Sequence, residues 1–184
     1  MTVNTTWTSP VSATLDKTTG GTIDETMTDA IASNFYHLGG ASGHIGARVY
    51  HTATQSLTTG VAAALVFNSE RYDLDPNAAI HDTSSNTSRL VCRTAGKYLI
   101  GASVRFATNA TGLRALDILF NGATIIAVAA QAAFAGAQVD MTISTVYDLA
   151  AGQYVEVRGY QTSGGALNVE AAGDYTPEFW MAKV

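Results

Sequence analysis

Four histidines are the residues of this chain best suited to metal binding or proton transfer. His37, His44 and His51 stand at intervals of seven residues, and His81 stands apart from them. The first three fall on a predicted helix end, a linker and a strand, so nothing brings their imidazoles together on a zinc ion. Neither the Gly-x-Ser-x-Gly nucleophile motif nor the His-Glu-x-x-His zinc motif occurs. The histidines therefore give no reason to expect a metal.

The carboxylates offer two other chemistries. Asp73, Asp75 and Asn77 are spaced like the start of an EF-hand calcium loop, but Ala78 replaces its glycine and Ser84 its bidentate glutamate. We interpret the segment as a turn, with a looser calcium site as the alternative. Glycoside hydrolysis needs a pair of carboxylates, and the sequence does not pair any of the candidates. These are Asp73, Asp75, Glu156 and Asp174. We therefore expect a protein that is not an enzyme and has no cofactor.

The amino-acid composition limits which partners are expected. Of the 184 residues, 47% are hydrophobic and only 14% are charged, whereas the surface of a free monomer usually carries more charge. This balance favours subunits that pack against one another. The net charge is −5 and no basic run occurs, so nucleic acid is not expected as a partner. The one cysteine, Cys92, falls in a strand pattern and is predicted to be a buried, inert thiol.

Targeting segments are not predicted either. The N-terminal residues lack the charged and apolar regions of a secretory signal. No apolar run is long enough to span a membrane as a helix. We therefore expect a soluble product, made in a cytoplasm, that has no membrane partner.

Two unequal parts follow each other along the chain. Residues 1–40 are predicted to be an arm and one amphipathic helix, which Thr22 and Glu25 begin with a capping box. Residues 41–46 are predicted to be a linker, and residues 47–184 a β-domain. The helix is marginal alone in water, so its apolar stripe must pack on the β-domain, on copies of itself or on another protein. The stripe consists of Ile23, Met27, Ile31, Phe35 and Leu38.

Strand and turn patterns fill the β-domain. The strongest is a long strand whose strict alternation places one sheet face on a core. The residues predicted to face inward are Tyr98, Ile100, Ala102, Val104 and Phe106. Asn121-Gly122 predicts a tight hairpin, Val61–Phe67 a strand, and Tyr72–Ser85 a loop. Some nine or ten strands with no helix between them predict an all-β fold, an antiparallel jelly-roll sandwich.

One late strand indicates a contact between subunits. If Val155 and Val157 point into the core, the tyrosines on either side of them point outward. Two exposed tyrosines on one strand face are costly unless something covers them, and a neighbouring subunit is the simplest cover. We therefore predict a subunit interface formed by Tyr154, Arg158 and Tyr160.

Five short motifs follow one another in the β-domain. They are Phe67-Asn68 with Tyr72-Asp73, Ala95-Gly96-Lys97-Tyr98, Phe120-Asn121-Gly122, Leu149-x-x-Gly152-x-Tyr154-Val155, and Phe179-x-Met181-x-x-Val184. In this order they resemble the tumour-necrosis-factor/complement globular-head superfamily. The resemblance implies a ten-stranded jelly roll that forms homotrimers around inner-sheet aromatics. The sequence departs from the superfamily at Gly152-Gln153, where Gly-Asp is usual.

The first forty residues resemble a different group. Trp7-Thr8-Ser9-Pro10, a Gly-Thr turn, a short helix and Asn34-Phe35-x-x-Leu38 are similar to the leader of many tailed-bacteriophage virion proteins. That resemblance implies that Trp7 and the helix stripe dock onto capsid or tail proteins of the virion. The β-domain would then face outward.

The favoured function is therefore that of a non-enzymatic bacteriophage structural protein. It would be a homotrimeric decoration, fibre or spike on the head or tail, attached by its N-terminal arm and located in the virion. The alternative is a carbohydrate- or receptor-binding module for a host-surface glycan, which needs aromatic side chains at loop tips. The candidates for that function are Tyr72, Phe134 and Tyr175.

Overall fold

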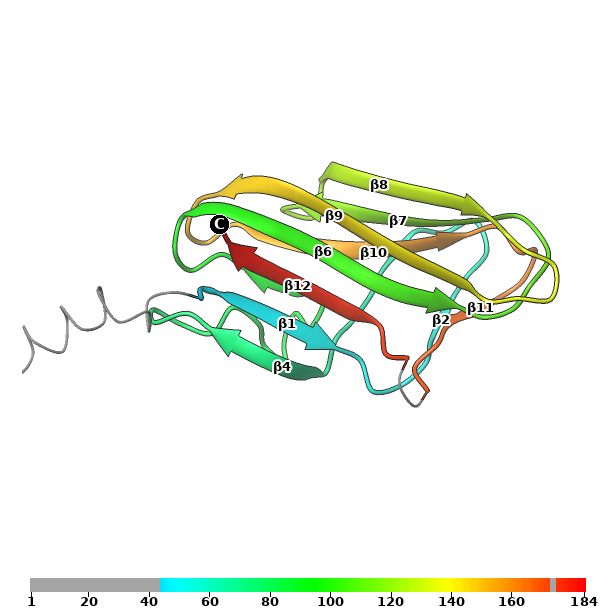
Figure 1. Ribbon diagram of the computed structural model, residues 1–184, viewed down its shortest axis with the longest axis horizontal. Helices are drawn as coiled ribbons and strands as arrows, with labels where there is room; N and C mark the ends of the chain where they lie inside the picture. The colour runs from blue at the N-terminus through cyan, green and yellow to red at the C-terminus, as the bar shows by residue number, and fades with distance from the viewer. Residues whose placement is uncertain (1–43, 173–174) are drawn as a thin grey trace, which may run out of the picture. The chain divides into compact units, whose positions relative to one another are not determined.

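Two antiparallel sheets pack face to face in the part of the chain that the computed structural model describes, residues 44–172 and 175–184 (Figure 1). The strands are β1 (Gly46–Tyr50), β2 (Gln55–Leu57), β3 (Ala63–Ala64), β4 (Ser69–Leu74), β5 (Arg89–Val91), β6 (Gly96–Phe106), β7 (Leu113–Phe120), β8 (Thr124–Ala132), β9 (Val139–Leu149), β10 (Tyr154–Gln161), β11 (Leu167–Val169) and β12 (Glu178–Lys183). These described residues include no helix that could cross a membrane. The predicted all-β antiparallel sandwich is confirmed.

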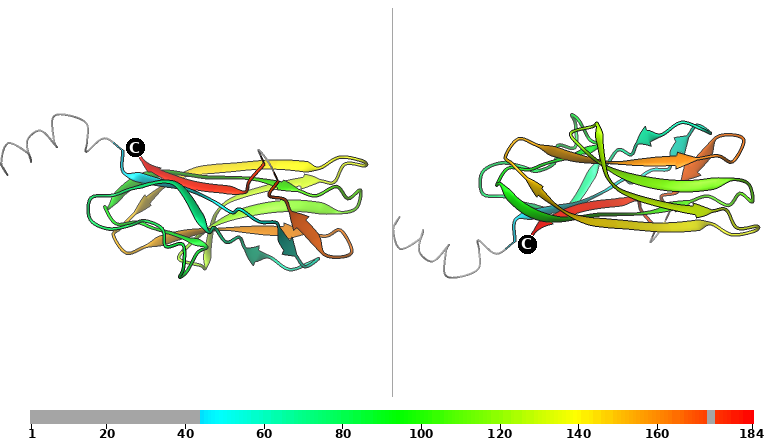
Figure 2. Two further views of the ribbon diagram at one scale, coloured as in Figure 1. Left: turned by 90° about the horizontal axis from the view of Figure 1, so that it is seen from below. Right: turned by 90° about the horizontal axis from the view of Figure 1, so that it is seen from above.

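The two sheets divide the strands unequally. A seven-stranded sheet has the order β2-β11-β6-β12-β1-β4, with β9 paired to β6. A five-stranded sheet has the order β3-β10-β7-β8, with β5 paired to β10. In the views of Figure 2, β12 (red) and β10 (orange) lie in the two different layers. Sequence-distant strands are neighbours in both sheets, so the fold rests on long-range pairing.

The core lies between the inner faces of the sheets. The five inward residues predicted for the long strand are all on β6, and none of them is more than 3% exposed. The rings of Phe67 and Phe179 meet at a centroid distance of 5.6 Å. Val155 and Val157 are fully buried on β10, as the alternation predicted. Cys92 is buried, as predicted, one residue after the end of β5, and burial raises the pKa of its thiol.

The hairpin predicted at Asn121-Gly122 connects β7 to β8. Both residues have positive φ, 49° and 69°, as the tight turn between twisted strands requires. The turn is also bound to β10: the backbone N–H of Asn121 donates to the Tyr154 carbonyl, and the Tyr154 N–H donates to Asn121 Oδ1, each over 2.9 Å. This hairpin is confirmed.

Three boundaries differ from the prediction. Within Val61–Phe67 only Ala63–Ala64 forms a strand, because the flanking residues do not join a regular ladder. The predicted loop Tyr72–Ser85 begins too early, since the end of β4 pairs with β1 up to Leu74. β1 starts at Gly46, inside the predicted linker. The strands β2 and β4 were not predicted, and the described residues contain twelve strands rather than nine or ten.

Gly122→Ala is expected to lower the free energy of unfolding by about 1–3 kcal/mol, because a non-glycine residue is strained at this φ. The new Cβ would also lie 2.8 Å from the Tyr154 hydroxyl oxygen. Urea denaturation measures the loss. Gly136→Ala is the matched control, since Gly136 has φ of 77° and no neighbouring atom within 4 Å. Equal losses in both variants would contradict a contact between the turn and Tyr154.

Candidate binding surface on the seven-stranded sheet

The histidines do not converge in the part of the chain that the structure describes. His81 is buried, with Nδ1 at 3.0 Å from Glu70 Oε1 and Nε2 at 3.2 Å from the Thr87 carbonyl oxygen. His51 contacts the backbone of its own turn. No group of three or more potential metal ligands occurs among the described residues. His37 lies outside them.

The predicted carboxylate candidates have structural partners. Asp73 accepts hydrogen bonds from two backbone N–H groups of the loop that follows it. Asp75 accepts one from the backbone of Asn77, over 2.9 Å. Glu156 accepts one from Arg89 Nε over 3.1 Å. The backbone hydrogen bonds of Asp73 and Asp75 are typical of a turn, and they favour the interpretation of Asp73–Asn77 as a turn. The contact of Glu156 with Arg89 is an ion pair. Asp174 lies outside the described residues.

The face of Tyr154, Arg158 and Tyr160 points out of the five-stranded sheet, as predicted. Both tyrosines are nevertheless half-buried within a single chain, so the expectation of exposed tyrosines is wrong. The Arg89 guanidinium lies 4.1 Å from the centre of the Tyr154 ring and covers it. Arg158 donates to Asp117 over 2.8 Å. The role of this face in a subunit interface remains a prediction.

The predicted docking residues of the arm and helix are not on the described part of the chain. They are Trp7, Ile23, Met27, Ile31, Phe35 and Leu38.

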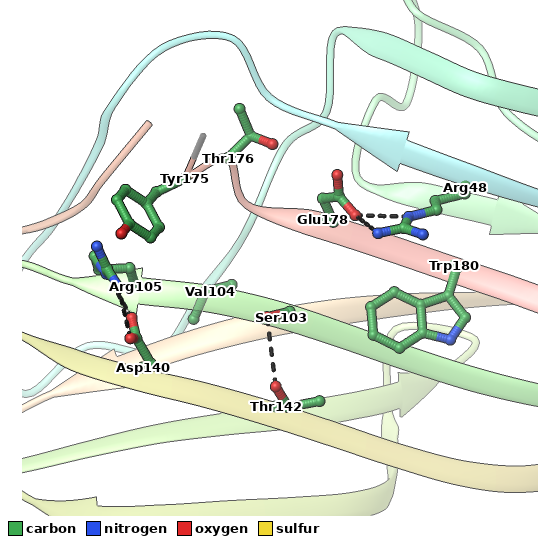
Figure 3. A pocket seen from close by; sticks show the side chains of 10 residues that line it. All are labelled: Arg48, Ser103, Val104, Arg105, Asp140, Thr142, Tyr175, Thr176, Glu178 and Trp180. Atoms are coloured by element: carbon green, nitrogen blue, oxygen red, sulfur yellow. Dashed lines mark hydrogen bonds and ion pairs between the residues drawn. The ribbon is translucent and has the colours of Figure 1, made fainter. Parts of the chain in front are cut away.

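The outer face of the seven-stranded sheet carries a hollow of about 500 Å³ (Figure 3). Side chains from β1, β6, β9 and β12, and from the segment before β12, converge on it. The lining residues are Arg48, Ser103, Val104, Arg105, Asp140, Thr142, Tyr175, Thr176, Glu178 and Trp180. Its volume falls in the range of small-molecule sites, about 300–1,000 Å³.

One end of the hollow is closed by a fixed ion pair. Arg105 donates to both carboxylate oxygens of Asp140, over 2.5 and 2.7 Å. The guanidinium carbon lies 3.4 Å from the centre of the Tyr175 ring. Two hydrogen bonds from Arg105 hold the pKa of Asp140 below its ordinary value. Sandwiched between a carboxylate and an aromatic ring, Arg105 has little freedom to turn toward a ligand.

The other end has more positive charge than its one carboxylate balances. Glu178 accepts hydrogen bonds from Arg48 Nε over 2.6 Å and from Arg71 Nε over 3.2 Å. The Arg48 guanidinium carbon lies 5.9 Å from the centre of the Trp180 ring, and that of Arg71 lies 4.2 Å from the centre of the Tyr50 ring. Two guanidinium groups therefore share a single carboxylate.

The indole of Trp180 lies against the backbone of β6. A Cβ at Gly101 would be 2.6 Å from Trp180 Cζ2, so the ring rests where a side chain would otherwise stand. Figure 3 shows the ring face-on above the sheet. Trp180 was missed as a site residue because it falls in a strand. The available signal was the glycine in the middle of an alternating strand.

Of the three aromatic side chains predicted for glycan binding, the structure places one at this surface. Tyr175 lines the hollow and is 53% exposed. Phe134 is exposed on the loop between β8 and β9, and it does not line the hollow. Tyr72 belongs to β4, where it pairs with Arg48 in β1, and it is not at a loop tip as predicted.

A second surface feature is apolar. Leu99, Ile125, Val128 and Val146 are 39–62% exposed, and we refer to these four residues as the apolar edge. Leu99 and Val146 are directly opposite each other on β6 and β9. Ile125 and Val128 belong to β8, which lies next to β9 where the two sheets meet (Figure 1). They are opposite Leu119 and Asp117 of β7 and face outward from the five-stranded sheet, whereas Leu99 and Val146 face outward from the seven-stranded sheet.

No family model matches the sequence, and no curated protein matches it. Solved structures do match the fold. Eiger TNF from S. frugiperda is similar with a TM-score of 0.56 and 12% identity, over 77% of this chain and 92% of that one. The globular domain of zebrafish complement 1qA is similar with a TM-score of 0.52 and 11% identity, over 76% and 95%. Murine APRIL, in the structure at pH 8.0, gives 0.54 and 13%, over 77% and 99%.

The β-domain has the tumour necrosis factor/complement 1q fold. The resemblance predicted for residues 47–184 is thereby confirmed at the level of the jelly-roll architecture. At 11–13% identity the likeness concerns the fold alone. Assembly and attachment are matters for a proposal.

Asp140→Asn is expected to make the stability less sensitive to acid. Because Arg105 lowers the pKa of Asp140 in the folded state, the ionised carboxylate stabilises the fold above its ordinary pKa of 3.8. This contribution is lost as the pH falls from there through the folded pKa. The pair is partly exposed, so we expect a loss of at most about 1 kcal/mol at neutral pH.

Urea midpoints at about pH 7 and about pH 3 measure this effect. The drop between them should be smaller in Asp140→Asn than in the unmodified chain. Asp148→Asn is the matched control, an exposed carboxylate on the same face of β9. An unchanged drop in Asp140→Asn would contradict a stabilising pair with Arg105.

Proposed function

We propose that this chain is a non-enzymatic structural protein of a bacteriophage virion, a homotrimeric decoration, fibre or spike on the head or tail. The observation that carries the proposal is the apolar edge on a domain of the tumour necrosis factor/complement 1q fold. The virion is its proposed location, after synthesis in the host cytoplasm.

The apolar edge favours assembly. Two exposed aliphatic pairs, one on each outer face, leave apolar area in the region where β8 and β9 are neighbours, in a protein with only 14% charged residues. Burial of such a surface contributes roughly 25 cal/mol per Å². A contact between this edge and a different surface of the next copy closes into a ring when the rotation between copies fits. The superfamily that the sequence resembles forms homotrimers, so three copies are expected.

The part of the apolar edge on the seven-stranded sheet, Leu99 and Val146, is a better interface than the face of Tyr154, Arg158 and Tyr160. On that face Tyr154 is already covered by Arg89, and Arg158 is already paired with Asp117. Covering it with a second subunit would remove paired charges from water, which offsets much of the gain. The apolar side chains have no such partners to lose.

The attachment rests on the N-terminal leader. Its similarity to phage leaders, with Trp7 before Pro10 and an apolar stripe at helical spacing, supports docking onto a capsid or tail protein. A separate arm allows the β-domain to face outward while the arm is bound.

The solution mass measured by light scattering is expected to be three times 19.2 kDa. Val146→Glu should reduce the mass to that of a monomer, because a buried unpaired carboxylate is costly in an interface. The fold should survive, since Val146 is 56% exposed in the single chain. Val61→Glu, at 51% exposure and outside the apolar edge, is the matched control and should remain trimeric.

Tyr160→Glu distinguishes the two candidate interfaces. It should leave the mass unchanged if the apolar edge joins the subunits. A monomeric Tyr160→Glu together with a trimeric Val146→Glu would assign the interface to the five-stranded sheet instead. A monomeric unmodified chain would contradict the proposal of a trimer.

Deletion of residues 1–40 is expected to leave a folded trimer that no longer joins virions, because the arm is the proposed attachment. Circular dichroism and light scattering measure the first property. Co-sedimentation with particles assembled in the presence of the truncated chain measures the second. Normal incorporation, or an unfolded product, would overturn the proposed role of the arm.

A further inference from the structure

The hollow on the seven-stranded sheet has the groups that recognise a sugar ring. A pyranose has an apolar C–H face and a rim of hydroxyl groups, so it binds to a flat aromatic surface beside hydrogen-bonding side chains. Trp180 offers such a surface, because its indole rests on Gly101 and turns its other face away from the sheet. Ser103 and Thr142 place hydroxyl groups next to it, on β6 and β9.

The charges around the hollow favour an acidic ligand. At the Arg48 end two guanidinium groups face one carboxylate: Arg48, which lines the hollow, and Arg71, which lies beside it and donates to Thr176, share Glu178. The Arg105 end has two acidic residues, because Arg105 pairs with Asp140 and its backbone carbonyl accepts from the N–H of Glu170. The unbalanced positive charge is therefore at the Arg48 end. A carboxylate on the ligand would supply the missing partner, in the geometry that guanidinium groups bind best.

The arginine side chains at the two ends of the hollow differ in exposure and in the contacts that hold them. The side chains of Arg48 and Arg71 are 48% and 49% exposed, so either can turn toward a ligand. The Arg105 side chain is only 18% exposed and is held by Asp140 and Tyr175. The Arg105 end is therefore a fixed wall, and the Arg48 end is where a carboxylate would be bound.

We propose that this hollow binds an acidic saccharide, whose ring stacks on Trp180 and whose carboxylate pairs with Arg48 and Arg71. This site goes beyond the proposed structural function and gives the outward domain a means of contact with a charged glycan on a host surface. It does not depend on the number of subunits, since Arg71 and every residue that lines the hollow belong to one chain.

Isothermal titration of the full-length protein with a glucuronic-acid disaccharide tests the proposal. The methyl ester of the same disaccharide keeps the ring and removes the charge. We expect the acid to bind, and the ester to bind at least about tenfold more weakly, since a charge-assisted hydrogen bond contributes about 1.5–3 kcal/mol. Absence of binding by the acid, or equal binding of acid and ester, would overturn the proposal.

Two variants locate the site. Arg48→Gln should weaken binding of the acid about tenfold without changing the affinity for the ester, and Trp180→Ala should abolish both. Arg48 is exposed, so its variant keeps the test valid even if Trp180→Ala does not fold, which thermal melting shows. Lys97→Gln and Phe134→Ala are matched controls outside the hollow and should bind normally. Unchanged binding by Arg48→Gln would overturn the assignment.

The monomeric variant Val146→Glu separates this proposal from that of the trimer. It should bind the acid with the affinity of the unmodified protein, whether or not the unmodified protein is a trimer. Binding by Val146→Glu alone would overturn the inference, because the hollow would then belong to the contact between subunits.

Discussion

The register of β6 against its two neighbours determines what the outer face of the seven-stranded sheet presents. Three cross-strand pairs make up the features of that face: Leu99 with Val146, Gly101 with Trp180, and Arg105 with Asp140. Because side chains alternate between the faces of a sheet, a slip of one residue would turn every one of them inward. The apolar edge, the aromatic surface and the ion pair thus depend on one alignment.

The core fixes that alignment. The inward face of β6 carries Tyr98 and Phe106 at its ends, both fully buried, and a slip would expose them to water. Burial of one large apolar side chain stabilises the fold by about 1.5–3 kcal/mol, so the four large inward side chains of β6 oppose any other register. Surface groups on β6, β9 and β12 are accordingly held in place by the packing beneath them. A binding surface built on such strands needs little reorganisation.

Local patterns were sufficient to predict much of this fold. The alternation of β6, β9 and β10 and the dipeptide Asn121-Gly122 are determined by residues near in sequence, and each was located correctly. Strand β4 was not predicted. Its last residues include Asp73, a residue type common in turns, and the strand forms because it pairs with β1, which is distant in sequence. Arg89 covers the ring of Tyr154, and because the two residues are far apart in sequence, no local pattern predicts this contact. The hollow could not be predicted for the same reason. The alternation of β6 shows that Arg105 points outward, but Asp140 and Tyr175, which contact it, are distant in sequence.

The two proposed surfaces share the strands β6 and β9 but use opposite ends of them. Leu99 and Arg105 are six residues apart on β6, roughly 20 Å along the strand. A neighbouring subunit that covers the apolar edge therefore does not have to cover the Arg105 end. Trp180 lies between the two, opposite Gly101, and is the residue at which the surfaces meet. The charges of Arg48 and Arg71 beside it oppose an apolar contact there, because they would lose water with a single carboxylate between them. The guanidinium groups of Arg48 and Arg71 thus limit how far an apolar subunit contact extends across the sheet. The limit lies at the edge of the hollow, beside Trp180.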